Sequence, residues 1–196
     1  MGKIFYVMGK SASGKDTIYK RIREEMPELK TVVPYTTRPI RSGETDGVEY
    51  HFTTEEELTR LKLEGRVIEI RTYLTMFGPW SYATVHDGQI DLEQGDYLLI
   101  GTLESYMNTR RFFGAEALVP LYIEVEDGER LWRALLRERQ QENPKYEELC
   151  RRFLADAEDF SEDRLAEAGI GKRFENKEFS LCVQAILDEI RYYALN

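Results

Sequence analysis

A glycine-rich segment between a predicted strand and a predicted helix constrains this chain more than any other feature. Residues 9–15 read Gly-Lys-Ser-Ala-Ser-Gly-Lys, which fits the G-x-x-x-x-G-K pattern of a phosphate-binding loop. The apolar run over residues 3–8 is typical of a buried parallel strand, and apolar side chains at four-residue spacing predict a helix over residues 16–25. A strand, a glycine-rich turn and a helix in this order open an α/β fold.

The chemistry of such a loop explains its residue types. Glycines let backbone N–H groups curl around a phosphate, and the following helix directs its positive end at the same anion. Lys15 is expected to reach the β- and γ-phosphates of ATP. Asp16 follows it where Ser or Thr usually holds Mg²⁺, so either Asp16 or Thr17, one place later, is the expected metal ligand. The expected ATP-binding residues are Gly9, Lys10, Ser11, Ala12, Ser13, Gly14, Lys15, Asp16 and Thr17.

The rest of the chain continues the α/β pattern. Residues 66–71, 96–100 and 117–125 are predicted strands, and residues 30–52 look extended and irregular. Thr54 and Glu57 form a capping-box pattern before a short helix. Strands that alternate with helices predict a parallel sheet covered by helices on both faces. The other predicted helices span 129–140, 146–160 and 180–194.

Length and composition narrow the class of protein. A chain of 196 residues suits a single domain, and its net charge of −9, from 27 basic and 36 acidic residues, argues against a nucleic-acid-coating surface. No apolar run approaches the roughly 18 residues of a membrane span, and no secretion signal opens the chain, so a cytoplasmic location is expected. The two cysteines and two histidines show no metal-binding or disulfide spacing.

A second motif follows the phosphate loop. Arg38, Arg41, Glu44, Gly47 and Tyr50 recur at strict three-residue steps. Two guanidinium groups and a phenol on one loop suit the binding of a monophosphate, and 18 of the 27 basic residues are arginine, whose planar fork matches phosphate. The alternative interpretation is an exposed basic loop with turn glycines.

Residues 36–52 resemble the signature of the guanylate kinase family, a group of P-loop nucleoside monophosphate kinases. Every constrained position of T-[ST]-R-x2-[KR]-x2-[DE]-x2-G-x2-Y-x-[FY] is filled, and weaker similarity extends over about residues 3–192. The resemblance implies ATP- and Mg²⁺-dependent phosphorylation of GMP, and of dGMP, to the diphosphate. It also implies a core of residues 1–33, 86–136 and 153–196, an acceptor-binding lobe of residues 34–85 and a lid of residues 137–152.

The resemblance assigns roles to individual residues. Arg38, Arg41 and Tyr50 would bind the acceptor phosphate, Glu69 would accept from the two N–H donors of guanine, and Phe77 takes the place of a family tyrosine. The residues implied to act on the transferring group are Lys15, Arg38, Arg137, Arg139 and Arg152. For each of the three lid arginines, a solvated helix face is the simpler interpretation.

The chain departs from the family pattern around the base. Pro34 stands where a serine usually donates to the base, and Gly101 and Leu103 replace the two acids of an Asp-x-Asp pair, with Glu104 the only nearby acid. These changes weaken the case for guanine specificity and leave both phosphate sites intact.

Two alternatives stay open at this point. A related kinase group phosphorylates a ribose bisphosphate and shares Gly-Lys-Asp, which Asp16 favours, whereas the complete second motif and Glu69 argue against it. A second alternative is a catalytically inactive, phosphopeptide-binding module, against which the intact Gly9, Gly14 and Lys15 argue. The expected partners are small nucleotides, with neither nucleic acid nor membrane, and monomer and dimer are both compatible with the sequence.

Overall fold

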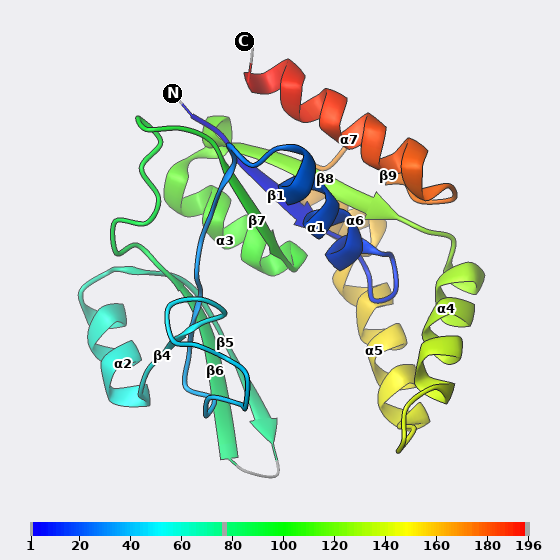
Figure 1. The fold of residues 1–196 in the computed structure, drawn as a ribbon, viewed down its shortest axis with the longest axis horizontal. Helices are drawn as coiled ribbons and strands as arrows, with labels where there is room; N and C mark the ends of the chain where they lie inside the picture. The colour runs from blue at the N-terminus through cyan, green and yellow to red at the C-terminus, as the bar shows by residue number, and fades with distance from the viewer. Residues whose placement is uncertain (1, 76–77, 195–196) are drawn as a thin grey trace.

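The strand before the phosphate loop lies at the centre of a five-stranded parallel sheet. In the computed structural model, which describes residues 2–75 and 78–194, the strand order is β2-β7-β1-β8-β9 (Figure 1). β1 pairs in parallel register with β7 on one side and β8 on the other, and all five of its residues are buried. The strands are β1 (Ile4–Met8), β2 (Lys30–Thr31), β7 (Tyr97–Gly101), β8 (Leu118–Glu124) and β9 (Phe174–Glu175).

Helices cover both faces of this sheet because successive side chains of β1 point to opposite sides. Phe5 and Val7 pack with α1 (Lys15–Glu25) and α7 (Phe179–Ala194), and Tyr6 and Met8 pack with α3 (Leu103–Phe113) and α6 (Glu162–Glu167). A short 3₁₀ turn, Ala115–Ala117, leads from α3 into β8. The predicted α/β class, with a parallel sheet between helices, is confirmed.

Residues 35–85 form a second, smaller sheet with its own core. Its order is β4-β3-β6-β5, and β5 and β6 make a long antiparallel hairpin. The α2 helix begins where Thr54 accepts a hydrogen bond from the N–H of Glu57, as predicted, and it packs Leu58 and Leu61 against this sheet. The elements are β3 (Tyr35–Thr36), β4 (His51–Phe52), α2 (Glu55–Leu63), β5 (Val67–Thr75) and β6 (Gly78–Val85).

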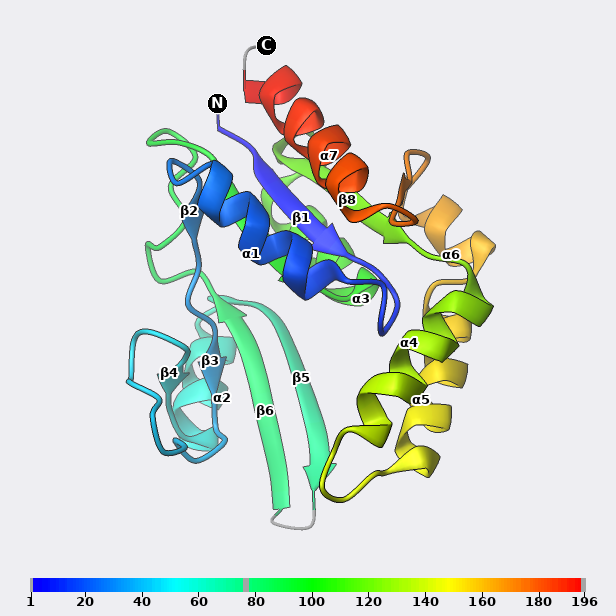
Figure 2. The ribbon, with the colours of Figure 1, turned by 45° about the vertical axis from the view of Figure 1, so that its right-hand side comes forward.

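Two antiparallel helices form an arm on the far side of the molecule from α2. α4 (Asp127–Arg139) starts after β8, α5 (Tyr146–Asp159) returns toward α6, and the two extend beside the β5–β6 hairpin in both ribbon views (Figure 2). Both helices lie within two residues of their predicted starts and one of their predicted ends. Within the described residues, none of the helices has the length and apolar character that crossing a membrane requires.

Candidate active site

The loop between β1 and α1 has a shape that requires glycine at positions 9 and 14. A Cβ on Gly9 would lie 2.6 Å from the carbonyl oxygen of Ile123, and a Cβ on Gly14 would lie 2.6 Å from Nδ2 of Asn176. Gly14 has φ +87° and Ala12 has φ +63°, so the loop turns through the left-handed region twice. Asn176 also donates to the carbonyl oxygen of Ser13 at 2.8 Å. The loop is therefore held in its curled form by the neighbouring strand end.

The loop leaves unpaired donors at the start of α1. Gly14 caps the helix without a side-chain hydrogen bond, so the first-turn N–H groups stay available to a ligand. The Ser13 hydroxyl is buried and has no hydrogen-bond partner among the described residues. Among the described residues, Lys15 makes a single ion pair, with its neighbour Asp16 at 3.4 Å. Backbone dipoles, a hydroxyl and an ammonium group around one loop fit the phosphates of a nucleotide.

The two residues predicted as metal ligands, Asp16 and Thr17, are exposed on the first turn of α1. No group of three or more His, Cys, Asp or Glu side chains that could hold a metal occurs in the described ranges. A carboxylate and a hydroxyl beside a phosphate loop fit Mg²⁺, which is usually bound by one or two protein oxygens together with substrate phosphates and water.

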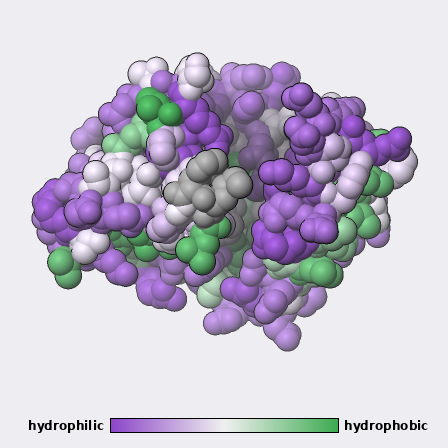
Figure 3. Space-filling view, turned by 90° about the horizontal axis from the view of Figure 1, so that it is seen from below, coloured by the Kyte–Doolittle hydropathy of each residue, from purple (hydrophilic) through white to green (hydrophobic). Residues whose placement is uncertain are grey.

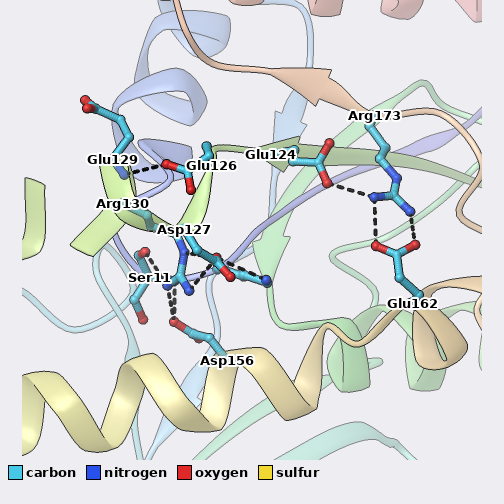
Figure 4. Close-up of polar contacts among 10 residues, drawn as sticks. Ser11, Glu124, Glu126, Asp127, Glu129, Arg130, Asp156, Glu162 and Arg173 are labelled. Atoms are coloured by element: carbon cyan, nitrogen blue, oxygen red, sulfur yellow. Dashed lines mark hydrogen bonds and ion pairs between the residues drawn. The ribbon is translucent and has the colours of Figure 1, made fainter. Parts of the chain in front are cut away.

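A buried arginine joins the α4–α5 arm to the phosphate loop, and the sequence patterns did not single it out. Arg130, 1% exposed, donates to the carbonyl oxygen of Ser11 at 3.2 Å, to Asp156 at 3.1 Å and to Asp127 at 2.9 Å (Figure 4). Asp156 in turn accepts from the N–H of Ser11 at 2.8 Å. The ring of Phe153 lies 4.3 Å from the guanidinium carbon of Arg130. This network fixes the base of the arm to the loop.

Removing Arg130 should destabilise the fold through this network. We expect Arg130→Ala to lower the free energy of unfolding by about 3 kcal/mol, because it leaves the Asp156 carboxylate without its ionic partner in a largely buried setting. Arg151→Ala, which removes an exposed arginine from the same arm, is the control and should leave the denaturation midpoint unchanged. Equal midpoints for the two variants in urea denaturation would contradict a structural role for Arg130.

The three predicted lid arginines differ in their surroundings. Arg137 and Arg152 line one small cavity together with Ser11 of the phosphate loop, and Arg152 is held by Glu148 at 2.9 Å. Arg139 is exposed and makes no ion pair within the part of the chain that the structure describes. Two of these three arginines therefore share a cavity lining with the loop.

The second motif forms a cationic cluster on the smaller sheet. Arg38, 4% exposed, pairs with both carboxylate oxygens of Glu44 at 2.8 and 3.0 Å, and its guanidinium carbon lies 5.4 Å from the Tyr50 ring centre. The Glu44 hydrogen bonds raise the pKa of Arg38, and Arg38 together with the N–H of Arg41 lowers the pKa of Glu44. Arg41 keeps its side chain exposed. The charges of Arg38 and Arg41 suit a monophosphate.

Tyr82 of β6 also belongs to this cluster, although it was not predicted from the sequence. Its ring packs edge-on against Tyr50 at 5.8 Å, and its phenol contributes, after Glu44, to the raised pKa of Arg38. The period-two pattern Tyr82, Thr84 on one strand face was the signal that could have found it. Phe77, predicted to replace a family tyrosine, lies outside the described residues.

Glu69 of β5 lies at the junction of the two sheets, 6% exposed. Its carboxylate accepts from Arg71 Nε at 3.1 Å and Nη2 at 3.4 Å, from Thr84 Oγ1 at 3.0 Å and from Ser105 Oγ at 3.1 Å. The Tyr6 phenol is close by, and its burial, with a smaller contribution from the Glu69 charge, raises the pKa of Tyr6.

The structure shows what surrounds the positions at which the chain departs from the family pattern. A Cβ on Gly101 would lie 2.3 Å from the hydroxyl oxygen of Tyr6, so the Tyr6 phenol occupies the space of a side chain at that position. Leu103, the other replaced acid, is buried as the first residue of α3 and contributes to the core. Pro34 is half-buried between the sheets.

A cavity of about 500 Å³, which we call the acceptor cavity, joins the helix after the phosphate loop to the smaller sheet. Tyr6, Tyr19 and Ile100 line it from the core, and Pro34, Tyr50 and Thr84 line it from the other side. Seen from below, the surface is hollowed between the smaller sheet and the α4–α5 arm, with mostly hydrophilic residues along the rim (Figure 3).

The comparisons with known proteins agree on one family. Residues 1–91 match the family model described as guanylate kinase. The chain is 33% identical over 120 residues to the guanylate kinase of Chlorobaculum tepidum, 60% of each chain, and 46% identical over 76 residues to that of Frankia casuarinae, 39% of each chain. The matches thus span about 60% or less of these relatives' length. A solved guanylate kinase structure from Anaplasma phagocytophilum shares the fold, with a TM-score of 0.63 and 22% identity over the whole of this chain and 87% of that one.

Proposed function

We propose that the chain transfers a phosphoryl group from ATP to GMP, and to dGMP, in purine nucleotide metabolism, because residues 1–91 match the guanylate kinase family model. The observation that carries the proposal is the presence of two anion-binding features, the phosphate loop with Lys15 and the cluster around Arg38 and Tyr50, and the acceptor cavity borders the second of them at Tyr50. The loop suits a triphosphate, and the cluster suits a monophosphate. Phosphoryl transfer from the first ligand to the second is the reaction that such a pair of sites would serve.

The proposed mechanism relies on positioning and charge, since phosphoryl transfer needs little covalent help from the protein. The loop N–H groups and Lys15 hold the donor phosphates, and Arg38, Arg41 and the phenols of Tyr50 and Tyr82 orient the acceptor phosphate. Asp16 or Thr17 would hold Mg²⁺, which would supply positive charge to the donor phosphates. Arg137 and Arg152 add positive charge from the arm.

Three parts of the chain have separate roles in the proposed reaction. Residues 34–85 bind the acceptor, residues 137–152 act as a lid that excludes water, and the remainder is the core that binds ATP. Closure brings the lid arginines over the transferring group. We place the reaction in the cytoplasm, since it draws on ATP and a free nucleotide, and the proposed partners are nucleotides rather than nucleic acid or membrane.

A panel of acceptors tests the function. ATP consumption is measured against GMP, dGMP, IMP, AMP, CMP, UMP and ribose 1,5-bisphosphate, and the product is identified by chromatography. We expect GDP and dGDP as the products formed fastest. If ribose 1,5-bisphosphate is the better acceptor, the alternative that Asp16 favours is correct. If ATP binds and no acceptor is phosphorylated, the chain is a binding module.

Activity should require Mg²⁺ strictly, and the reason is the position of Asp16. A carboxylate beside the β-phosphate repels it unless a cation lies between them, so chelation should abolish turnover. Asp16→Ser, which supplies a hydroxyl ligand instead, should retain activity within about tenfold. Glu24→Ser, at an exposed position two turns further along α1, serves as the control. Full activity in excess chelator would show that this account of Asp16 is wrong.

A further inference from the structure

The Glu69 carboxylate has no free capacity to accept another hydrogen bond. A carboxylate offers about four lone-pair sites, two on each oxygen. Here Oε1 accepts from Thr84 and from Nη2 of Arg71, and Oε2 accepts from Ser105 and from Nε of Arg71. An incoming guanine would need two of these sites for its N1–H and 2-amino donors. Two of the four present donor groups must therefore leave before Glu69 can bind the base, and Arg71 alone supplies two, one on each oxygen.

Arg71 presents to Glu69 the same arrangement of donors that guanine would present. The N1–H and 2-amino groups of guanine belong to a guanidine unit within the ring, and the Nε and Nη2 groups of Arg71 are the matching pair on a free guanidinium. Both form a planar fork that addresses the two oxygens of a carboxylate. We propose that Arg71 is an internal competitor of guanine and sets the specificity of the acceptor site, an inference that rests on the proposed function.

Of the three residues that donate to Glu69, Arg71 is the one whose side chain has room to move away. Its side chain is 27% exposed, whereas Ser105 is fully buried and the hydroxyl of Thr84 sits on a short side chain. Arg71 lines a second cavity of about 370 Å³, which we call the side cavity, on the α3 and α6 side of β5. Glu104, Asp159 and Arg164 line the same cavity.

The side cavity offers Arg71 a second ionic position. Asp159 pairs with Arg164 at 2.9 Å, while Glu104 makes no ion pair or side-chain hydrogen bond within the described part of the chain. A guanidinium that leaves Glu69 can thus meet an unpaired carboxylate instead of being left without a partner in the protein. The arginine has two positions, on Glu69 without a base and toward Glu104 when guanine takes its place.

This competition lowers the affinity for guanine without lowering that for other bases. The apparent dissociation constant rises as the fraction of molecules with a free Glu69 falls, so an arginine that occupies the carboxylate nine times in ten weakens GMP about tenfold. AMP has no donor pair for Glu69 and gains nothing when Arg71 leaves. Arg71 therefore reduces the difference in affinity between GMP and AMP in the native protein.

The test measures GMP and AMP binding by calorimetry, and kcat/KM for both acceptors, in the wild type, Arg71→Leu and Glu104→Gln. Arg71→Leu should bind GMP about tenfold more tightly and AMP with unchanged affinity, so the ratio between the two rises about tenfold. Glu104→Gln should weaken GMP severalfold, because it removes the second position of the guanidinium. Arg191→Leu, which removes an exposed arginine of α7, is the matched control and should change neither constant.

Binding and turnover separate this inference from the proposed function. If no variant phosphorylates GMP and Arg71→Leu still binds it more tightly, the function is wrong and the competition is correct. If the wild type phosphorylates GMP and Arg71→Leu binds GMP with equal or lower affinity, Arg71 is a positioning residue for Glu69. The proposed competition is then wrong. If neither form binds GMP, the competition is likewise overturned.

Discussion

Lys15→Ala is expected to abolish phosphoryl transfer and leave the fold intact. The ammonium group stands at the start of α1, beside the phosphate loop, and in the proposed mechanism it neutralises charge that develops on the transferring group. Removing a single such stabilising group from an active site typically costs about 10² to 10³ in kcat. We expect a loss of at least ~10²-fold in kcat with ATP and GMP as substrates. The measurement is a steady-state assay at saturating concentrations of both nucleotides.

The structure explains why stability should not change. Lys15 makes one ion pair, with the largely exposed Asp16 at 3.4 Å, and such pairs contribute little to folding. Lys20→Ala, an exposed lysine further along the same helix, is the matched control and should keep full activity. Thermal unfolding should give the same midpoint for both variants. A purified Lys15→Ala protein with near wild-type turnover would show that the phosphate loop does not serve catalysis.

The sequence was most informative where function is built from neighbouring residues. The phosphate loop, its strand and its helix lie within residues 3–25, so their pattern predicts both the local structure and the burial of the strand in a parallel sheet. The motif around Arg38 also lies within one loop, and Arg38, Glu44 and Tyr50 do meet there. In both cases the residues that act together are close in the chain.

The sequence was least informative where distant residues meet. Arg130 and Asp156 are 26 positions apart, and their contact with Ser11 depends on how the arm packs against the loop. The strand predicted over residues 66–71 continues to Thr75 and pairs with β6, because the hairpin is stabilised by cross-strand pairing rather than by its own alternation. The α3 helix was missed since its apolar residues are interrupted by Asn108, Arg110 and Arg111.

At Glu69 the resemblance predicts a role, but the sequence does not predict which side chains contact the carboxylate. The resemblance pointed to a carboxylate that reads guanine, and the structure places Glu69 beside the acceptor cavity through its bond to Thr84. Nothing in the sequence indicates that Arg71, two residues along the same strand face, turns its guanidinium back onto that carboxylate. Side chains at i and i+2 share one face of a strand, so the pairing is possible, but only the packed structure selects it.

The second large effect is expected at Glu69 itself. Glu69→Gln should cut kcat/KM for GMP at least ~100-fold, because each hydrogen bond to the carboxylate contributes about 1.5–3 kcal/mol and an amide presents only one acceptor oxygen. The values for AMP and for ATP binding should stay nearly unchanged. IMP, which keeps N1–H and lacks the 2-amino group, should fall between GMP and AMP. The measurement is kcat/KM for the three acceptors in the wild type and the variant.

Discrimination between guanine and other bases should depend mainly on Glu69, because two neighbouring positions offer no side-chain group that could also contact the base. Pro34 has no side-chain donor, and at Gly101 the space of a side chain is filled by the Tyr6 phenol. Glu57→Gln, at an exposed acid on α2, controls for loss of charge in the same lobe. A combined Glu69→Gln and Arg71→Leu variant should lose no more GMP activity than Glu69→Gln alone, since the competitor matters only while the carboxylate is present. Equal use of GMP, IMP and AMP by the wild type would show that Glu69 does not read the base.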